Sequence, residues 1–209
     1  MKETYHHGDL RNALVAAAAG LVEQNGSDAF SLREAARLVG VTANAAYRHF
    51  ADKADLLTAV AALGFDQLAA AMQAAVGTRQ AESRAPVSAE VRLRVIAACY
   101  VGLATGRPQM FRLMFGANGL CRISAARLNA TMTSPGLELA AALDLLVVEG
   151  RMSAQNRIGA HLRVWSLVHG FAALILDGPH IVAGGAERER ALAGLVDFAL
   201  AALCDLDRG

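Results

Sequence analysis

The sequence carries little net charge, few aromatic residues and only three cysteines, and each shortage limits what the protein can be. Its 20 basic and 19 acidic side chains leave a formal net charge of +1. A strongly basic balance would indicate nucleic-acid binding, so bulk charge gives no such indication here. Aromatic residues make up 5% of the chain, and alanine and leucine far outnumber valine and isoleucine. That composition favours helices over sheets and predicts an all-α protein.

Cysteine pairs, long apolar runs and catalytic motifs are also missing. Cys99, Cys121 and Cys204 are odd in number and far apart, so neither a disulfide framework nor a zinc site is predicted. No signal peptide is recognisable, and charged residues interrupt the apolar runs before they reach the roughly 20 residues that span a bilayer. We therefore expect a cytoplasmic protein with no membrane partner, metal or cofactor. The lack of glycine-rich phosphate loops, GxSxG, HExxH and paired carboxylates argues against an enzyme.

Apolar periodicity predicts helices along the whole chain. Leucine and alanine recur at three- and four-residue steps over residues 9–24, and Gly26 suits the left-handed position that ends this helix. The polar segment 77–86 is predicted to be the loop between an N-terminal domain, residues 1–65, and a second domain, residues 66–209. Further helices are predicted at 87–105, 108–115, 121–132, 136–149, 154–177 and 187–205, with breaks or helix starts at Pro108, Pro135 and Pro179.

Two short helices joined by a tight turn are predicted between residues 31 and 49. Ser31 and Glu34 form a capping box for the first helix, which ends at Gly40. Thr42 suits the N-cap of the second helix, which runs through His49, and a fourth helix follows from residue 52 to about 76. Such a pair is a helix-turn-helix, whose second helix fits the major groove of DNA. The alternative is two short helices in the core of a protein-interaction domain that binds no DNA.

The segment FSLREAARLVGVTANAAYRHFADKADLL, residues 30–57, resembles the DNA-binding domain of tetracycline-repressor-like (TetR family) regulators. The resemblance covers about residues 5–65. It departs at Ala46, where such proteins commonly have leucine, which reduces the packing under the second helix. It implies a three-helix helix-turn-helix head joined by a linking helix to a helical body that binds a ligand and dimerises. The features that carry it, in register, are the capped first helix, Gly40-Val41-Thr42, Tyr47, Phe50, Lys53 and Leu57.

The resemblance also implies a set of DNA contacts. Asn44 can read adenine through a bidentate amide contact, while Tyr47 and His49 are expected at phosphates. Lys53 combines an ammonium group with the free amides of a helix start, which suits a phosphate. The alternatives are a solvated Asn44, a half-buried core ring for Tyr47 and a surface role for His49. The predicted DNA-binding residues are Arg33, Thr42, Ala43, Asn44, Tyr47, Arg48, His49 and Lys53.

The last two predicted helices, 154–177 and 187–205, each carry an apolar stripe. In TetR-like proteins these helices usually pair with their copies in a four-helix dimer interface. A dimer would present two recognition helices to successive major grooves of a near-palindromic operator, about 34–36 Å apart. The stripes alone suit the core of a monomer equally well. The predicted interface residues are Val168, Phe171, Ile175, Leu195, Phe198 and Leu203.

Two groups of side chains are candidates for an effector pocket. Trp165, His169 and Gly170 resemble a Trp–His–Gly signature in the C-terminal domains of one TetR subgroup, and the first two share a helix face. They predict a pocket wall with a polar handle; the alternative is a buried histidine packed on a tryptophan. Segment 108–115 is rich in Met and Phe, which suits either an apolar effector or a core. The predicted pocket residues are Met110, Phe111, Met114, Phe115, Trp165 and His169.

The resemblance thus implies a one-component transcriptional regulator. We expect a repressor that binds its operator as a dimer and is released by a small-molecule effector. Release requires the effector to bind better when the two heads are wrongly spaced, which shifts the population away from the DNA-binding form. Ligand-assisted repression and activation remain alternatives.

Overall fold

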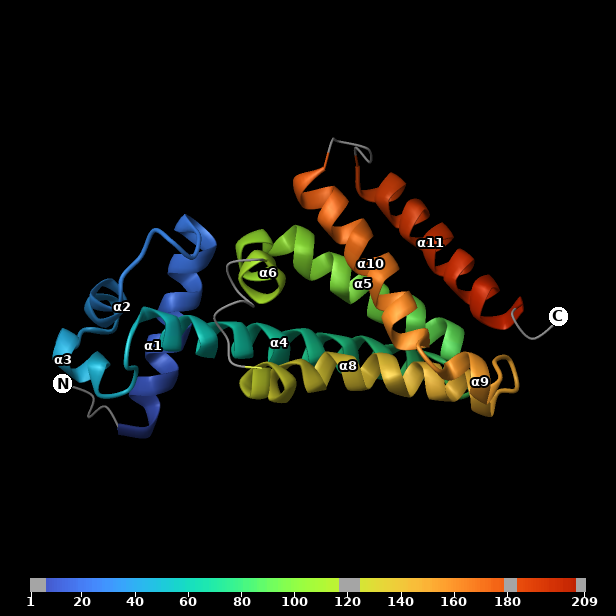
Figure 1. Cartoon of the computed structure of the whole chain (residues 1–209), viewed down its shortest axis with the longest axis horizontal. Helices are drawn as coiled ribbons and strands as arrows, with labels where there is room; N and C mark the ends of the chain where they lie inside the picture. Colours follow the sequence, from blue (N-terminus) through green and yellow to red (C-terminus); the bar gives the residue numbers. More distant parts are fainter. Residues whose placement is uncertain (1–6, 117–124, 179–183, 206–209) are drawn as a thin grey trace. The chain divides into compact units, whose positions relative to one another are not determined.

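The computed structural model describes residues 7–116, 125–178 and 184–205, and every regular element in these ranges is a helix (Figure 1). The predicted all-α class is therefore confirmed. Contacts divide the chain into two units: Met1–Asp66 with Arg107–Met132, and Gln67–Gly106 with Thr133–Gly209. Two long helices, α4 (Lys53–Glu82) and α8 (Ala125–Val148), contribute to both units.

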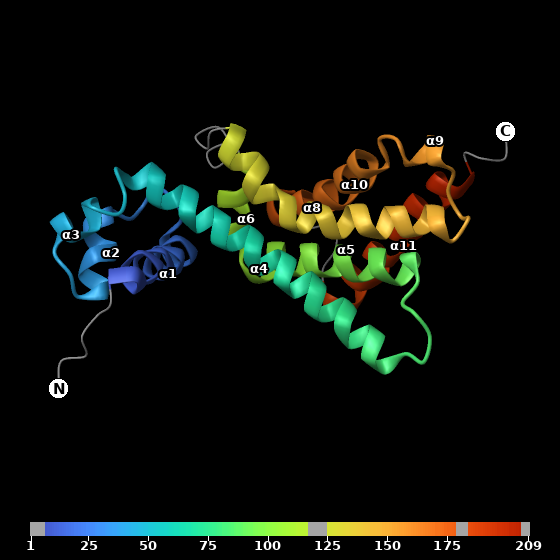
Figure 2. The ribbon, with the colours of Figure 1, turned by 90° about the horizontal axis from the view of Figure 1, so that it is seen from below.

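The first unit gathers α1 (His7–Asn25), α2 (Leu32–Val39), α3 (Ala43–Tyr47), the start of α4 and α6 (Pro108–Phe115) (Figure 2). Its apolar stripes meet in one core, and α1 ends as predicted, with Gly26 at a φ of 79°. The α6 N-terminus has no cap of its own; the Glu23 carboxylate accepts hydrogen bonds from the amides of Gln109 and Met110, at 3.2 and 3.3 Å. The largest fully buried side chains of this core include Leu14, Phe50, Leu56, Val60 and Phe65.

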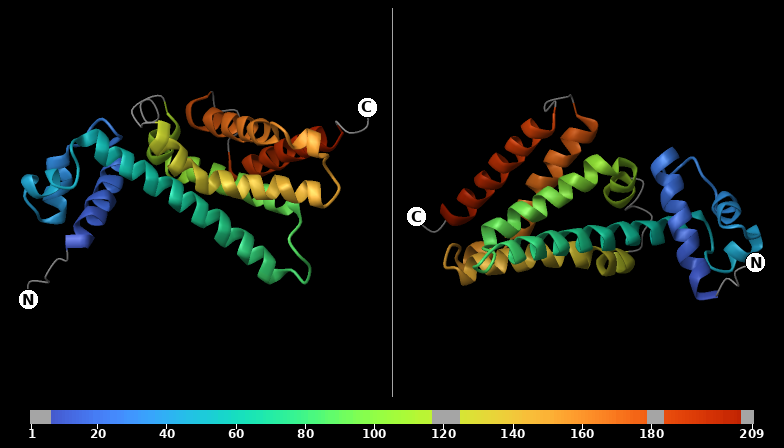
Figure 3. Two further views of the ribbon diagram at one scale, coloured as in Figure 1. Left: turned by 60° about the horizontal axis from the view of Figure 1, so that its bottom comes forward. Right: turned by 180° about the vertical axis from the view of Figure 1, so that it is seen from behind.

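The second unit is organised around α5 (Ala89–Gly106), which contacts both α10 (Ala160–Asp177) and α11 (Gly185–Asp205). Both views of Figure 3 show α10 and α11 beside each other and against α5. Arg94 links α5 to α11 electrostatically, because its guanidinium pairs with Glu90 on its own helix and with Asp197 on α11. The short α9 (Ala154–Arg157) precedes α10.

The predicted loop at residues 77–86 is wrong over its first six positions, because α4 continues to Glu82. All six of these residues are exposed, so the polar side chains among them reflect a solvent-exposed helix and not a break in it. Most are good helix formers. The Thr78 hydroxyl donates to the Ala74 carbonyl at 3.0 Å, and Arg79 pairs with Glu82 at 3.7 Å. The connection to α5 is therefore shorter than expected.

Two further helix boundaries differ from those predicted. Residues 125–148 form one helix, and Pro135 lies inside it although proline usually breaks a helix at a cost of about 3 kcal/mol. The apolar face after it, Leu139, Ala142, Leu143 and Leu146, is buried and offsets that cost. By contrast, the single helix expected at 154–177 is divided, because Ile158 is extended and Gly159 has a φ of 72°. Residues 121–124 and Pro179 lie outside the described residues.

By length and composition, α4 is also the one helix among the described residues that qualifies as a membrane span. Of its most apolar window, 44% is buried inside the protein. Leu56, Val60, Leu68 and Met72 supply much of that burial, and each is 2% exposed or less. The apolar character of α4 is thus accounted for in large part by packing within the chain.

Glycines at two positions of α4 provide a matched test of packing in the first unit. A Cβ added to Gly64 would lie 2.6 Å from Met114 Sδ and 2.9 Å from Met110 Sδ, and both methionines are fully buried. A Cβ added to Gly77 would meet nothing within 4 Å. Removing a helical glycine stabilises by up to about 1 kcal/mol, whereas overpacking a core costs about 1–3 kcal/mol.

We therefore predict opposite signs for the two alanine variants. Gly77→Ala should raise the free energy of unfolding by up to about 1 kcal/mol, and Gly64→Ala should lower it by about 1 kcal/mol. Urea denaturation followed by circular dichroism measures both. Equal stabilisation by the two substitutions would show that the methionines do not enclose Gly64.

Candidate nucleic-acid interface

The turn between α2 and α3 is built from backbone geometry that this sequence favours locally. Ser31 Oγ accepts the Glu34 amide at 3.2 Å and caps α2, as predicted. The helix ends at Gly40, whose φ of 76° is left-handed and suits glycine. Thr42 Oγ1 then accepts the Ala45 amide at 3.3 Å and caps α3. The predicted N-caps at Ser31 and Thr42 are confirmed, and the Gly40 turn with the Thr42 cap fixes where α3 begins.

One side of the α3 region is open to solvent, and the other is core. Ala46 and Phe50 are buried at 0% and 1% exposure, so the small Ala46 still packs against the first unit. The predicted DNA contacts fall on the open side or at its margin. Among them, Thr42, Asn44, Tyr47 and Arg48 are exposed, and Ala43 and His49 are half-buried.

Tyr47 is 47% exposed, so its ring is partly packed while its phenol end reaches solvent. The Thr42 hydroxyl has accepted a backbone amide and can still donate its own hydrogen. Asn44 is exposed among the residues that the structure describes in the first unit. The α3 surface is therefore sterically available to a duplex, which the prediction of DNA contacts requires.

The acidic and the basic side chains near α3 are used differently. Asp52 accepts the Asp55 amide at 2.8 Å, and Asp55 accepts the Ala51 amide at 3.2 Å. Both carboxylates are thus engaged at the positive N-terminal end of α4. Among the side chains that the structure describes, Arg33, Arg37 and Arg48 are exposed and form no ion pair. This part of the chain can consequently still offer unpaired cations, although its acidic residues are at least as numerous as its basic ones.

Lys53 is placed differently from the other predicted contacts. Its Nζ donates to the Asp28 carbonyl at 2.9 Å and lies 4.9 Å from the centre of the Phe30 ring. One of the three ammonium hydrogens is therefore used within the protein, and two remain for a phosphate. The side chain is held at the start of α4 instead of extending freely from it.

The Met- and Phe-rich helix α6 lies in the core of the first unit. Met110, Phe111 and Met114 are 3% exposed or less. The Phe115 ring is 5.2 Å from the Phe65 ring in an edge-on contact and 4.8 Å from Phe111. These side chains fill space between α1, α4 and α6, which corresponds to the core alternative considered for them.

Trp165 and His169 lie in the second unit and meet a residue that the sequence did not single out. The Tyr100 hydroxyl and His169 Nδ1 share a hydrogen bond of 2.8 Å, and Trp165 Nε1 donates to the same hydroxyl at 3.3 Å. Burial raises the pKa of Tyr100 well above its ordinary value, so the phenol stays neutral. The sequence does not single out Tyr100, since a single tyrosine carries no signal that a partner lies 69 positions away.

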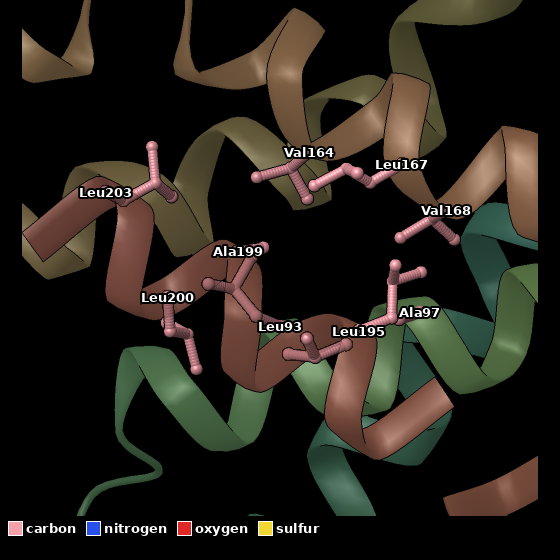
Figure 4. A pocket seen from close by; sticks show the side chains of 10 residues that line it. Leu93, Ala97, Val164, Leu167, Val168, Leu195, Ala199, Leu200 and Leu203 are labelled. Carbon is pink, nitrogen blue, oxygen red and sulfur yellow. The ribbon is translucent and has the colours of Figure 1, made fainter. Parts of the chain in front are cut away.

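The described interface candidates on α10 and α11 range from buried to exposed. Val168 and Leu203 are 7% and 2% exposed and line the contact with α5. Figure 4 shows Val168 and Leu203 among the side chains that line a cavity of only about 10 Å³, together with Leu93 and Ala97 of α5. That volume holds about one water at most. Val168 and Leu203 therefore belong to the core of the second unit, because α5 covers them.

The exposed side of the same helices is rich in apolar residues. Phe198 is 63% exposed, while Phe171, Ile175 and Leu195 are half-buried. Small residues surround Phe198 on α11, where Ala193, Gly194, Ala201 and Ala202 are all exposed. Leu162 and Leu174 of α10 are also exposed, at 61% and 53%, and Ile158, just before α10, is 69% exposed.

His169 gives the second unit a predictable dependence on pH. Burial lowers its pKa below the ordinary value of 6.5, and burial with the nearby Arg157 charge does the same for His161. The unfolded chain thus binds more protons than the folded chain once the pH falls below about 6.5. The stability contributed by the neutral histidines is complete above that pH. It is lost as the pH falls toward the pKa values that these histidines have in the folded state.

We therefore predict that the free energy of unfolding decreases from pH 7 to pH 5 and that His169→Gln makes this decrease shallower. The His161→Gln variant should remove the part of this pH dependence that His161 contributes. The double variant should show the smallest decrease in the free energy of unfolding. Urea titrations across the pH range measure the slopes. A His169→Gln slope equal to that of the wild type would contradict the inferred environment of this ring.

Comparison with known proteins gives one consistent result. A family model described as Tetracyclin repressor-like, C-terminal domain, matches residues 93–199. A second, described as Bacterial regulatory proteins, tetR family, matches residues 14–60, which include α2 and α3. No curated protein matches the chain.

Solved structures share this fold over nearly the whole chain. A protein of unknown function from Rhodococcus sp. RHA1 is 27% identical, with 97% of this chain and 100% of that chain covered and a TM-score of 0.79. A bacterial regulatory protein in the tetR family, from Rhodococcus RHA1, is 20% identical, with 96% and 98% covered and a TM-score of 0.66. The regulator FadR from Bacillus subtilis, in complex with stearoyl-CoA, is 15% identical, with 92% and 97% covered and a TM-score of 0.65. At 20% and 15% identity, these last two likenesses establish the fold alone.

Proposed function

Because the chain belongs to the TetR family of bacterial regulatory proteins and is a DNA-binding transcriptional regulator, we propose that it is a dimeric repressor, not an enzyme, released from its operator by a small molecule. The observation that carries the proposal is the exposed face of α3, with Thr42, Asn44 and Tyr47 open to solvent on a helix fixed at its start by a cap. A family member with this surface acts in the cytoplasm, where its DNA is.

In the proposed complex, α3 lies in the major groove, and different side chains contact the bases and the phosphates. Asn44 reads a base edge, because an amide can accept from and donate to adenine at once. Tyr47, Arg48, His49 and Lys53 contact phosphates and hold the helix in register. The small Ala43 lets the backbone approach the groove. Arg33, on the bracing helix α2, contacts the backbone nearby.

We predict that Asn44→Ala lowers the preference for the operator over mismatched duplexes by about 1–3 kcal/mol, roughly 5- to 150-fold. Non-specific binding should be little changed, since phosphates provide most of it. The probe is the duplex recovered by selection from random sequence, tested by gel shift beside the DNA flanking the gene. Gln155→Ala, an exposed position on α9, is the matched control. Failure of the wild type to retain any duplex would refute the DNA-binding proposal.

The dimer is proposed to form through the exposed side of α10 and α11. Its centre is the exposed Phe198 of α11, with the exposed Leu174 of α10 beside it in the proposal and the half-buried Phe171, Ile175 and Leu195 at its margin. Val168 and Leu203 are left out, because they pack within the chain. An exposed apolar surface of this kind marks an interaction site, and the small residues around Phe198 allow two helices to approach closely. A two-fold axis here would present two copies of α3 to one palindrome.

We predict that Phe198→Glu converts the dimer to a monomer and greatly weakens operator binding, because a buried unpaired charge opposes association. Leu137→Glu on α8 is the control, since Leu137 has the same 63% exposure as Phe198 but lies on neither α10 nor α11. Sedimentation velocity measures the mass, and gel shift measures operator binding. A Phe198→Glu protein that stays dimeric, or a Leu137→Glu protein that becomes monomeric, would place the interface elsewhere.

The effector is proposed to bind in the second unit, beside Tyr100, Trp165 and His169. These three side chains place hydrogen-bonding groups within an otherwise apolar helical body, an arrangement that suits an organic ligand with one polar end. FadR from Bacillus subtilis, which has the same fold, forms a complex with stearoyl-CoA, so the fold is compatible with such a ligand. Binding would repress or release according to which head spacing it favours.

A further inference from the structure

Arg11 on α1 is a cation that the helix-turn-helix pattern does not include. Its Cζ lies 5.0 Å from the centre of the Phe50 ring, and the residue itself is exposed. Phe50 directly follows His49 and is 1% exposed. The guanidinium therefore covers, from the solvent side, the ring that anchors the end of the α3 segment.

The Phe50 ring restricts where the Arg11 charge can lie. A buried ring has a fixed position, and a guanidinium that packs on its face keeps the N–H groups at its edge available to acceptors. Among the side chains that the structure describes, no carboxylate pairs with Arg11. The positive charge is thus held in place without being neutralised.

The location of this charge favours a nucleic-acid backbone over a purely structural role. Figures 1 and 2 both show the first turns of α1 beside α3, at the same end of the first unit. The nearby acids Asp52 and Asp55 are engaged as acceptors of backbone amides. Arg48 on the same segment is exposed and unpaired among the described side chains. A planar fork held beside such a segment matches the geometry of a phosphate.

We propose that Arg11 is a further DNA-binding residue, which contacts a backbone phosphate beside the one reached by the end of the α3 segment. The proposal rests on the proposed function, since it needs a duplex against α3. Phe50 acts as the positioning residue: it touches no DNA and orients the guanidinium. The contact carries no base information and therefore strengthens binding to every sequence alike.

The test is the salt dependence of binding to the selected duplex and to an unrelated duplex. Each phosphate contact contributes about 0.9 to the slope of log K against log salt. Arg11→Gln should reduce the slope by about 0.9 for each bound protomer and weaken binding by about eightfold per protomer near 0.1 M salt, equally on both duplexes. Arg11→Lys should keep the slope, because it keeps the charge. Arg84→Gln, an exposed arginine of the second unit, should match the wild type.

The outcomes separate this proposal from the function on which it rests. A wild-type protein that binds no duplex refutes the function itself. Normal wild-type binding with an unchanged slope for Arg11→Gln overturns only the Arg11 contact, and a lowered melting temperature beside that unchanged slope would assign Arg11 to packing. Should Arg11→Gln not fold, Arg11→Met keeps an apolar stem over the Phe50 ring and carries the same slope test.

Discussion

The left-handed backbone at Gly40 and the cap at Thr42 decide how α3 leaves α2, and the surface proposed to face DNA depends on that angle. A residue with a Cβ is strained at a φ of 76°, and without the Thr42 hydroxyl the first amides of α3 would lose an acceptor. Once these two positions are set, Ala46 and Phe50 turn inward while Asn44 and Tyr47 turn outward. The core on one side of α3 and the open surface on the other are thus consequences of one short turn.

In the first unit, the positions of the charged side chains matter more than the number of each sign. Basic and acidic residues nearly balance over the chain, yet Asp52 and Asp55 accept backbone amides at the start of α4. Acidic groups placed there stabilise a helix terminus, and arginines on the neighbouring surfaces are left without carboxylate partners among the described residues. Net charge therefore understates the attraction of this surface for a polyanion, because the two signs serve different purposes.

In the second unit, α10 and α11 bury one apolar face and leave other apolar side chains exposed. The buried face, which includes Val168 and Leu203, packs on α5 around almost no empty space. The exposed side chains, which include Phe198, are open in the single chain. The helices α10 and α11 belong to the core of the chain and also offer an apolar outer surface. Their position can therefore couple packing within one chain to association between two chains. Any ligand that shifts α10 through His169 would consequently act on the surface proposed to join two subunits.

Local signals in the sequence determined the helix caps, the Gly40 turn, the all-α class and the family of the head, because each depends on residues within a few positions of one another. The limits of α4 and α8 did not follow from such signals. The polar end of α4 is helical although exposed. Pro135 is tolerated inside α8 because burial of the apolar face that follows it offsets its cost. The partners of Trp165 and His169, and the side of α10 that is core, depend on α5, some 65–70 residues earlier in the chain. Only the tertiary structure decides these partners and this buried side. An apolar stripe in the sequence indicates that a helix face is covered, but it does not indicate which element covers it.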